Sequence, residues 1–249
     1  MIVAKEHNIK KDEFEGKVVL VTGANRGFGL AITMDLARAG ATVVMLGRDL
    51  GSLEYAYDAV VDAGLKEPIL YPLDLEGATP ENYQELQDNL LNEFGKLDGL
   101  VHNASILGTQ MPIEQYDIKL WYSTIQINLN APFMLTQFLI PALLKSDDAR
   151  IIFLSSTVGR KARAYWGAYS VSKFGIEGFA KTLSEELEKT QISVNTVNPG
   201  KLRTEMRRTA YPAEDSSTVP LPEEKSQAIV RLLSSSSPKI NGEQLTISD

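Results

Sequence analysis

The chain has 249 residues, of which 43% are hydrophobic and 23% charged, so it is long enough for one large α/β domain with a substantial core. A formal charge of -7 argues against nucleic acid as a partner. The absence of cysteine excludes thiol chemistry, and with only two histidines, His7 and His102, we expect no metal site.

In chain order, a charged stretch comes first and a glycine-rich turn follows. Residues 1–15 lack a long apolar run, so we expect an N-terminal extension, no membrane partner and a cytoplasmic protein. Residues 17–22 predict a buried strand that enters Thr22-Gly-x-x-x-Gly-x-Gly29, and 30–39 predict a helix. Such glycines let the backbone approach a pyrophosphate at a helix N-terminus, which indicates dinucleotide binding. A turn without a ligand is the alternative.

The end of the second predicted strand, 42–46, indicates which dinucleotide is bound. In NAD-binding folds an acidic side chain near this point holds the adenosine ribose. Here Gly47 and Arg48 stand at the strand end, and an arginine can bind a 2′-phosphate through two hydrogen bonds. Arg26 in the glycine turn adds a second cation. We therefore expect NADP(H) over NAD(H); in the opposing interpretation Asp49 holds the ribose and both arginines are solvated.

The remaining elements alternate between helix and strand, which predicts a parallel sheet with right-handed crossovers. Helices are predicted for 50–63, 80–94, 120–144, 165–189 and 223–233, and strands for 68–75, 97–103, 150–156, 192–197 and 243–247. Residues 205–222 contain proline, serine and mixed charge, which predicts a mobile loop. The strand ends on one edge of such a sheet line the ligand crevice.

Pro132 lies inside the predicted helix 120–144. Proline has no N–H group, so the carbonyl of Asn128 loses its helical partner. A buried carbonyl needs another donor, and water is a common one. We therefore expect a water on the Asn128 carbonyl that belongs to a proton path; the alternative is a simple kink.

Tyr169 and Lys173 are four residues apart on the predicted helix 165–189, so their side chains project from one face. A free tyrosine has a pKa of about 10 and keeps its proton near neutrality. A fixed positive charge lowers that pKa, so the pair predicts a general acid or base near pH 7. On spacing alone, two surface neighbours without a catalytic role are the alternative.

Together, in order and spacing, these motifs resemble the short-chain dehydrogenase/reductase family. Residues 22–29 resemble the family's cofactor loop, His102-Asn103-Ala104 its Asn-Ala-Gly turn, and 198–204 its nicotinamide-side loop. Ser156, thirteen residues before Tyr169, resembles the catalytic serine. Stretches 131–137, 159–169 and 203–207 are most similar to the bacterial YciK-type oxidoreductases.

The resemblance implies a fold and a set of site residues. The fold is one doubly wound α/β Rossmann domain over residues 16–249, with a seven-stranded parallel sheet in the order 3-2-1-4-5-6-7 and helices on both faces. The implied catalytic residues are Asn128, Ser156, Tyr169 and Lys173. The implied cofactor-binding residues are Thr22, Gly23, Asn25, Arg26, Gly27, Phe28, Gly29, Arg48, Asp74, Leu75, Asn103, Ala104, Tyr169, Lys173, Pro199, Gly200, Leu202 and Thr204.

The implied reaction is hydride transfer between nicotinamide and the carbonyl or secondary alcohol of a small molecule. Tyr169 would act as general acid or base. Lys173 would lower the pKa of Tyr169 and hold the nicotinamide ribose. Ser156 would bind the substrate oxygen, and Asn128 would position a relay water. A non-catalytic NADP-binding regulator or scaffold is the main alternative. A Ser-His-Asp hydrolase is a third, weakened because neither histidine stands in a convincing position.

Other expectations concern the substrate pocket and assembly. Trp166, Tyr165 and residues 205–222 are expected to border the substrate, and family analogy implies a homo-oligomer, a dimer or tetramer. Ser105 departs from the family, which usually has glycine after Asn-Ala, and Phe28 replaces a usual isoleucine. The C-terminal end lacks the family's usual Asp-Gly-Gly, so contacts between subunits through the tail are expected to be weaker.

Overall fold

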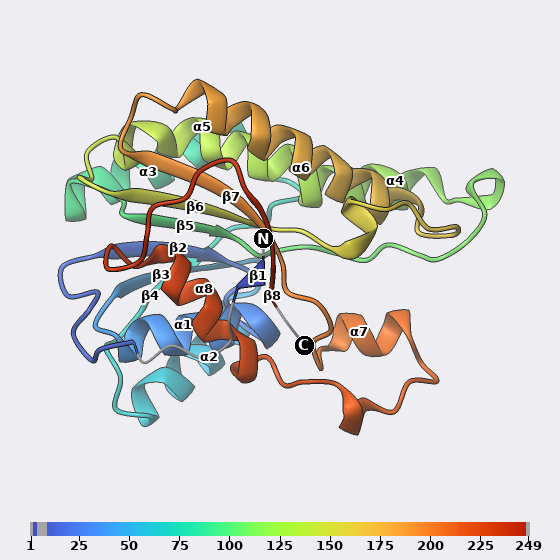
Figure 1. The fold of residues 1–249 in the computed structure, drawn as a ribbon, viewed down its shortest axis with the longest axis horizontal. Coiled ribbons are helices and arrows are strands. Elements are labelled where there is room, and N and C mark those ends of the chain that lie inside the picture. Colours follow the sequence, from blue (N-terminus) through green and yellow to red (C-terminus); the bar gives the residue numbers. More distant parts are fainter. Residues whose placement is uncertain (1, 4–8, 248–249) are drawn as a thin grey trace.

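Eight parallel strands form the centre of the molecule (Figure 1). The computed structural model describes residues 2–3 and 9–247, and the strands lie in the order β1-β8-β7-β6-β5-β2-β3-β4. Their bounds are β1 Ile2–Val3, β2 Val18–Thr22, β3 Thr42–Gly47, β4 Ile69–Pro72, β5 Gly99–His102, β6 Ala149–Leu154, β7 Ile192–Asn198 and β8 Gln244–Ile247. Strands β2 to β8 have the predicted order 3-2-1-4-5-6-7, which is confirmed.

The edge strand β1 was not predicted. Ile2 pairs with Thr246 and Val3 pairs with Ile247, so part of the expected N-terminal extension adds a strand next to β8. Residues 1, 4–8 and 248–249 lie outside the described part of the chain, and His7 is among them.

Helices cover both faces of the sheet, α1, α2 and α8 on one and α3 to α6 on the other (Figure 1). Their bounds are α1 Gly27–Arg38, α2 Leu50–Asp62, α3 Pro80–Phe94, α4 Ile118–Ile125, α5 Ala131–Leu143, α6 Gly167–Glu186, α7 Glu205–Ala210 and α8 Glu223–Leu233. Along β2, Val19 and Val21 pack with the first layer and Leu20 with the second, as alternation along a strand requires. Both faces are therefore hydrophobic core.

The predicted helix 120–144 is interrupted, as the position of Pro132 explains. A π-helical turn, Gln126–Asn130, separates α4 from α5, and the N–H of Ala131 donates to the carbonyl of Gln126, five residues back. The proline cannot continue the normal ladder, so the helix takes in one extra residue per turn here. Within the described residues, no helix combines the length and apolar character needed to cross a membrane.

Residues 205–222, expected to be a mobile loop, contain the helix α7 and a 3-10 turn at Ser216–Thr218. The Arg207 guanidinium makes two hydrogen bonds to Glu214, of 2.6 and 2.7 Å, which close the segment. Arg203 Nε donates to the carbonyl of Val219 at 3.0 Å and fixes its far end. The hydrogen bonds of Arg207 and Arg203 therefore give this segment a defined conformation.

Candidate active site

The residues predicted from the sequence come together at the carboxyl ends of the strands, on one edge of the sheet. The turn 22–29 follows β2, Arg48 follows β3, Asp74 and Leu75 follow β4, Asn103 and Ala104 follow β5, Ser156 follows β6, and residues 199–204 follow β7. Tyr169 and Lys173 come from the first turns of α6.

Gly29 is the most crowded position of the glycine turn. A Cβ on Gly29 would lie 2.1 Å from the carbonyl oxygen of Gly23 and 2.5 Å from Asn103 Nδ2. Gly23 has a φ of 62°, in the left-handed region that favours glycine, and a Cβ there would lie 3.0 Å from Ala104 Cα. The first turn of α1 therefore packs directly on the end of β5.

We expect Gly29→Ala to lower the free energy of unfolding by about 1–3 kcal/mol, because the added methyl forces the backbone to move. Gly178 in α6 is the matched control, since a Cβ there meets nothing within 4 Å. Alanine is favoured over glycine in a helix by up to about 1 kcal/mol, so Gly178→Ala should be neutral or stabilising. Urea unfolding compares the two, and equal stability of both variants would contradict the close packing at Gly29.

Thr22 and Asn103 tie the ends of β2 and β5 together. The hydroxyl of Thr22 accepts hydrogen bonds from the backbone N–H groups of Asn103 and Ala104, at 3.0 and 2.9 Å. In return, Asn103 Nδ2 donates to the carbonyls of Thr22 and Gly23, at 2.9 and 3.1 Å. The hydroxyl of Ser105, where the family usually has glycine, is buried and has no hydrogen-bond partner within the described residues.

Arg48 is exposed at the end of β3, and among the described residues its side chain makes no ion pair. Its neighbour Asp49 caps α2, because its carboxylate accepts hydrogen bonds from the backbone and hydroxyl of Ser52, at 2.8 and 2.5 Å. Those bonds lower the pKa of Asp49. Asp49 is therefore engaged as a helix cap, and Arg48 is the side chain of this pair that is open to a ligand.

The other predicted cofactor-binding residues divide between exposed and buried positions. Asp74 and Gly200 are exposed, Arg26 is exposed at the start of α1, and the side chains of Phe28, Leu75 and Leu202 are buried. Asn25 and Thr204 border the glycine residues: a Cβ on Gly47 would lie 3.5 Å from Asn25 Oδ1, and one on Gly27 would lie 3.5 Å from Thr204 Cγ2. The loop after β7 thus meets the glycine turn.

Ser156, Tyr169 and Lys173 meet where β6 ends against α6. Ser156 is near enough to Tyr169 for a side-chain hydrogen bond between them to lower the pKa of the phenol. Lys173 Nζ lies 5.6 Å from the centre of the Tyr169 ring and donates to the carbonyl of Leu154 at 2.8 Å. The three residues therefore lie close together, and both Tyr169 and Lys173 are buried.

The pKa of Tyr169 is shifted in the direction opposite to the predicted one. Burial raises the pKa of Tyr169 to about 12, although the hydrogen bond with Ser156 acts in the opposite direction. Burial also lowers the pKa of Lys173 to about 8, while the charge of Glu177 opposes that shift. The predicted lowering of the Tyr169 pKa is wrong for this arrangement, because desolvation dominates and the Lys173 ammonium is directed at the Leu154 carbonyl.

Asn128 holds the loop after β5 rather than standing free. Its side-chain oxygen accepts from the N–H of Ile106 at 2.8 Å, and its amide nitrogen donates to the carbonyl of Ile106 at 2.9 Å and to Ser172 Oγ at 3.1 Å. Ser172 lies between Tyr169 and Lys173 on α6. Asn128 thus links the π-helical turn, the β5 loop and α6. The expected water on its carbonyl stays a prediction.

Three supporting groups were not predicted. A Cβ on Gly159 would lie 2.8 Å from Lys173 Cβ, so the turn after Ser156 rests against α6. Arg160 Nε donates to Glu177 Oε1 at 2.7 Å and anchors the same turn one helical turn further along. Lys225, fully buried in α8, donates to the carbonyl of Pro199 at 3.0 Å. No local sequence signal links residues so far apart.

An aromatic cluster covers Tyr169 on the side of α7. Trp166 and Tyr169 have ring centres 5.8 Å apart, and Trp166 and Tyr211 have ring centres 5.9 Å apart. Leu107, Met206 and Ala210 pack on the same cluster. Trp166 and part of the 205–222 segment therefore pack beside Tyr169, and the side chain of Tyr165 is 61% exposed. That these residues border the substrate stays a prediction.

His102 is not placed to serve a hydrolase. Its ring stacks on Phe153 with centres 4.4 Å apart, and its Nε2 lies 2.8 Å from Thr136 Oγ1. Burial lowers the pKa of His102 to about 3, so the ring is neutral near pH 7. A buried, neutral core histidine accounts for these contacts.

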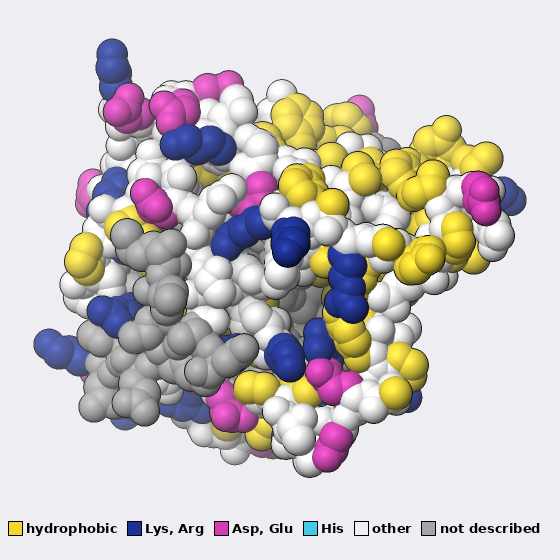
Figure 2. All heavy atoms as spheres, turned by 45° about the vertical axis from the view of Figure 1, so that its right-hand side comes forward, with side chains coloured by type: hydrophobic (Ala, Val, Ile, Leu, Met, Phe, Trp, Pro, Cys, Tyr) yellow, Lys and Arg dark blue, Asp and Glu magenta, His cyan; other side chains and the backbone are white. Residues whose placement is uncertain are grey.

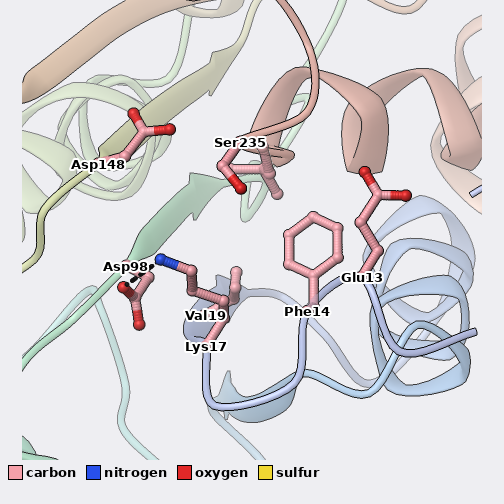
Figure 3. A pocket seen from close by; sticks show the side chains of 8 residues that line it. Glu13, Phe14, Lys17, Val19, Asp98, Asp148 and Ser235 are labelled. Carbon is pink, nitrogen blue, oxygen red and sulfur yellow. Dashed lines mark hydrogen bonds and ion pairs between the residues drawn. The ribbon is translucent and has the colours of Figure 1, made fainter. Parts of the chain in front are cut away.

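A pocket lies at the opposite edge of the sheet and contains none of the predicted site residues (Figure 3). It is lined by Glu13, Phe14, Lys17, Val19, Asp98, Asp148, Leu233 and Ser235. The Asp98 carboxylate accepts hydrogen bonds from Lys17, Lys96, Ser146 and the backbone of Val18. These donors stabilise the buried carboxylate of Asp98, which in turn links the start of β2 to the start of β5.

A parallel sheet with helices on both faces and a glycine turn between β2 and α1 is the architecture of Rossmann-type dinucleotide-binding proteins. Residues 17–215 match the family model described as short chain dehydrogenase. The chain belongs to the short-chain dehydrogenase family, and it is an NAD(P)-dependent oxidoreductase.

Three similar proteins illustrate this relationship. The uncharacterized oxidoreductase YciK of Escherichia coli K12 is 41% identical over 213 residues, 86% of this chain and 84% of YciK. The 3-oxoacyl-[acyl-carrier-protein] reductase FabG of Salmonella typhimurium is 34% identical over 195 residues, 78% of this chain and 77% of FabG. A short-chain dehydrogenase from Shigella flexneri 2a, solved in complex with NADP, has a TM-score of 0.92 at 39% identity and covers 95% of this chain and 99% of its own.

Proposed function

We propose that this protein reduces the carbonyl group of a small organic molecule with NADPH, or oxidises the corresponding secondary alcohol, with Tyr169 as general acid or base. The observation that carries the proposal is the group formed by Ser156, which follows β6, and by Tyr169 and Lys173 of α6. FabG, whose name describes a reductase of 3-oxoacyl groups, supports carbonyl reduction as the direction.

The glycine turn and the start of α1 fit a dinucleotide phosphate. Arg26, the N-cap of α1, provides no side-chain hydrogen bond to the helix, and no acidic residue lies in its first turn. The N–H groups and positive end of the helix are therefore open to an anion. Because Gly29 has no side chain, the start of α1 can pack directly against the backbone of Gly23, where a Cβ atom would clash.

NADP(H) is the better fit of the two nicotinamide cofactors. The 2′-phosphate that distinguishes NADP(H) would be held by the exposed Arg48, while Asp49, the acid that could bind a free ribose, is engaged at the cap of α2. Arg26 also lies on this edge of the sheet. The NADP complex of the Shigella relative supports the assignment.

The chain's own residues supply proton transfer and charge stabilisation, and the nicotinamide supplies the hydride. Because burial keeps Tyr169 protonated at neutral pH, the phenol is in the form that can donate a proton to a carbonyl oxygen. In the proposal, Ser156 donates a hydrogen bond to that oxygen. The Lys173 ammonium, at 5.6 Å from the ring, stabilises the negative charge left on the phenol.

The proposal is tested by following NADPH oxidation at 340 nm with a panel of activated ketones and quinones. We expect turnover with at least one compound and a lower rate with NADH. Tight NADPH binding without turnover of any compound would overturn the catalytic assignment. No observation favours a purely regulatory cofactor-binding protein.

We further propose that the protein is a homo-oligomer in the cytoplasm. Exposed apolar side chains gather on the face formed by α4, α5 and α6 (Figure 2): Ile118, Tyr122, Phe133, Val171 and Phe174. Contiguous exposed apolar surface of this kind usually marks an interface.

Phe174→Glu is expected to weaken assembly, because a carboxylate would be buried without a partner in the interface. Sedimentation velocity should show a smaller species for Phe174→Glu than for the unchanged protein at the same concentration. Tyr55→Glu is the control, since Tyr55 is 78% exposed on α2, on the other side of the sheet. An unchanged sedimentation coefficient for Phe174→Glu, or an equal loss in Tyr55→Glu, would exclude this face as the interface.

A further inference from the structure

We propose that Arg163 forms an anion-binding subsite next to Tyr169, and that the substrate is a carbonyl compound with an apolar body and a carboxylate group. The inference rests on the proposed function, since it names the substrate class of the same site. It is carried by the position of Arg163, by its lack of an acidic partner and by the apolar wall beside it.

Arg163 lies on the aromatic cluster that covers Tyr169. Its guanidinium carbon is 5.9 Å from the centre of the Trp166 ring and 5.6 Å from that of Tyr211, and its Nη1 donates to the Tyr211 hydroxyl at 2.8 Å. The Tyr211 hydroxyl is close enough to influence the titration of Tyr169 electrostatically. The guanidinium therefore contacts Tyr211 and Trp166, and the ring of Trp166 lies beside that of Tyr169.

Arg163 differs from the other arginines of the two bordering segments in what it binds. Arg160 pairs with Glu177, Arg207 with Glu214 and Arg208 with Glu205. Arg203 donates to the backbone carbonyls of Val219 and Ser217. Across residues 9–247, the only hydrogen-bond partner of the Arg163 side chain is the neutral hydroxyl of Tyr211.

This arrangement favours an anionic ligand over a neutral one. A guanidinium has five N–H donors in a planar fork that matches a carboxylate, and Arg163 uses one of them. The chain carries a net charge of -7, so positive charge here is not a property of the whole surface.

The neighbouring wall suits an apolar body between the carbonyl and the anionic end. Leu107, Val158 and Met206 belong to the cluster around Trp166 and Tyr169. Such side chains form no hydrogen bonds with a ligand, so they would stabilise binding by removing the apolar part of the ligand from water. A ligand with a carboxylate at Arg163 would replace the Tyr211 hydroxyl as its partner.

The test uses Trp166 as a fluorescent reporter. The chain has two tryptophans, so Trp121→Phe leaves Trp166, which Arg163 overlies, as the single one. This variant is titrated with 3-phenylpropanoate and with 3-phenylpropanamide, which have the same shape and differ in charge. Because no nucleotide or turnover is needed, the result is independent of whether NADPH oxidation is observed.

We expect the carboxylate to bind at least tenfold more tightly than the amide, and Arg163→Gln to reduce that preference to less than threefold. Lys161→Gln is the matched control, since it removes an exposed cation two residues away and should keep the preference. Tyr211→Phe removes the competing hydroxyl and should tighten carboxylate binding without changing the amide. Urea unfolding checks that each variant is folded.

Equal binding of acid and amide to the Trp121→Phe protein, including no detectable binding of either, would overturn the proposal. A preference that survives Arg163→Gln would also overturn it, because the charge would then act from another residue. If Arg163 serves only to fasten Tyr211, Tyr211→Phe and Arg163→Gln should weaken both probes alike, which is a third contrary result.

Discussion

Replacing Tyr169 with phenylalanine is expected to reduce turnover of the best carbonyl substrate by about 10²- to 10⁴-fold, the usual contribution of a positioned general acid. The substitution removes only the hydroxyl, whose pKa Ser156 influences, and leaves the ring that packs on Trp166. NADPH affinity should change little, because the glycine turn and Arg48 are untouched. Steady-state kinetics and fluorescence titration with NADPH measure the two effects separately.

Tyr55→Phe is the matched control, since it removes a hydroxyl from a 78% exposed side chain on α2 and should leave turnover unchanged. Near-normal turnover in Tyr169→Phe would remove Tyr169 from the mechanism. A loss of NADPH binding as large as the loss of turnover would instead make Tyr169 a cofactor-binding residue without an acid role.

Arg48→Ala is expected to weaken NADPH binding by about 10- to 100-fold, as the loss of hydrogen bonds from a guanidinium to a phosphate predicts. NADH lacks the 2′-phosphate, so its affinity should change less than about threefold. Isothermal titration with both nucleotides measures the ratio directly.

Arg38→Ala serves as the control for general charge effects. Arg38 lies in the last turn of α1, its side chain is 55% exposed, and it pairs with Asp35 of the same helix. It should leave both affinities unchanged. Equal losses of NADPH and NADH binding in Arg48→Ala would defeat the assignment of Arg48 to the 2′-phosphate.

The parts of the site that could be predicted depend on short-range geometry. The strand order was implied by the resemblance to the family and is found in the structure. The glycine turn and the four-residue spacing of Tyr169 and Lys173 follow from local spacing. The position of Pro132 correctly indicated a disturbed helix. These features are contained in neighbouring residues, so the sequence alone was enough to predict them.

The parts that could not be predicted depend on residues brought together by packing. The pKa of Tyr169 is raised because the aromatic cluster and α7 enclose it, and the residues of that cover lie some forty positions further along the chain. Arg160 and Glu177 meet across 17 positions, and Lys225 and Pro199 across 26. The helical sequence around Lys225 is equally compatible with a solvated lysine.

The residues packed against Tyr169 also bear on how its phenolic proton is restored. In the proposed reaction the phenol gives up one proton in every cycle and must regain one from bulk water. Met206, Ala210 and Tyr211 pack against the ring cluster that contains Tyr169, so their segment lies beside the phenol to which that proton must return. If the product leaves past the same segment, reprotonation and product departure would slow together in a viscous medium.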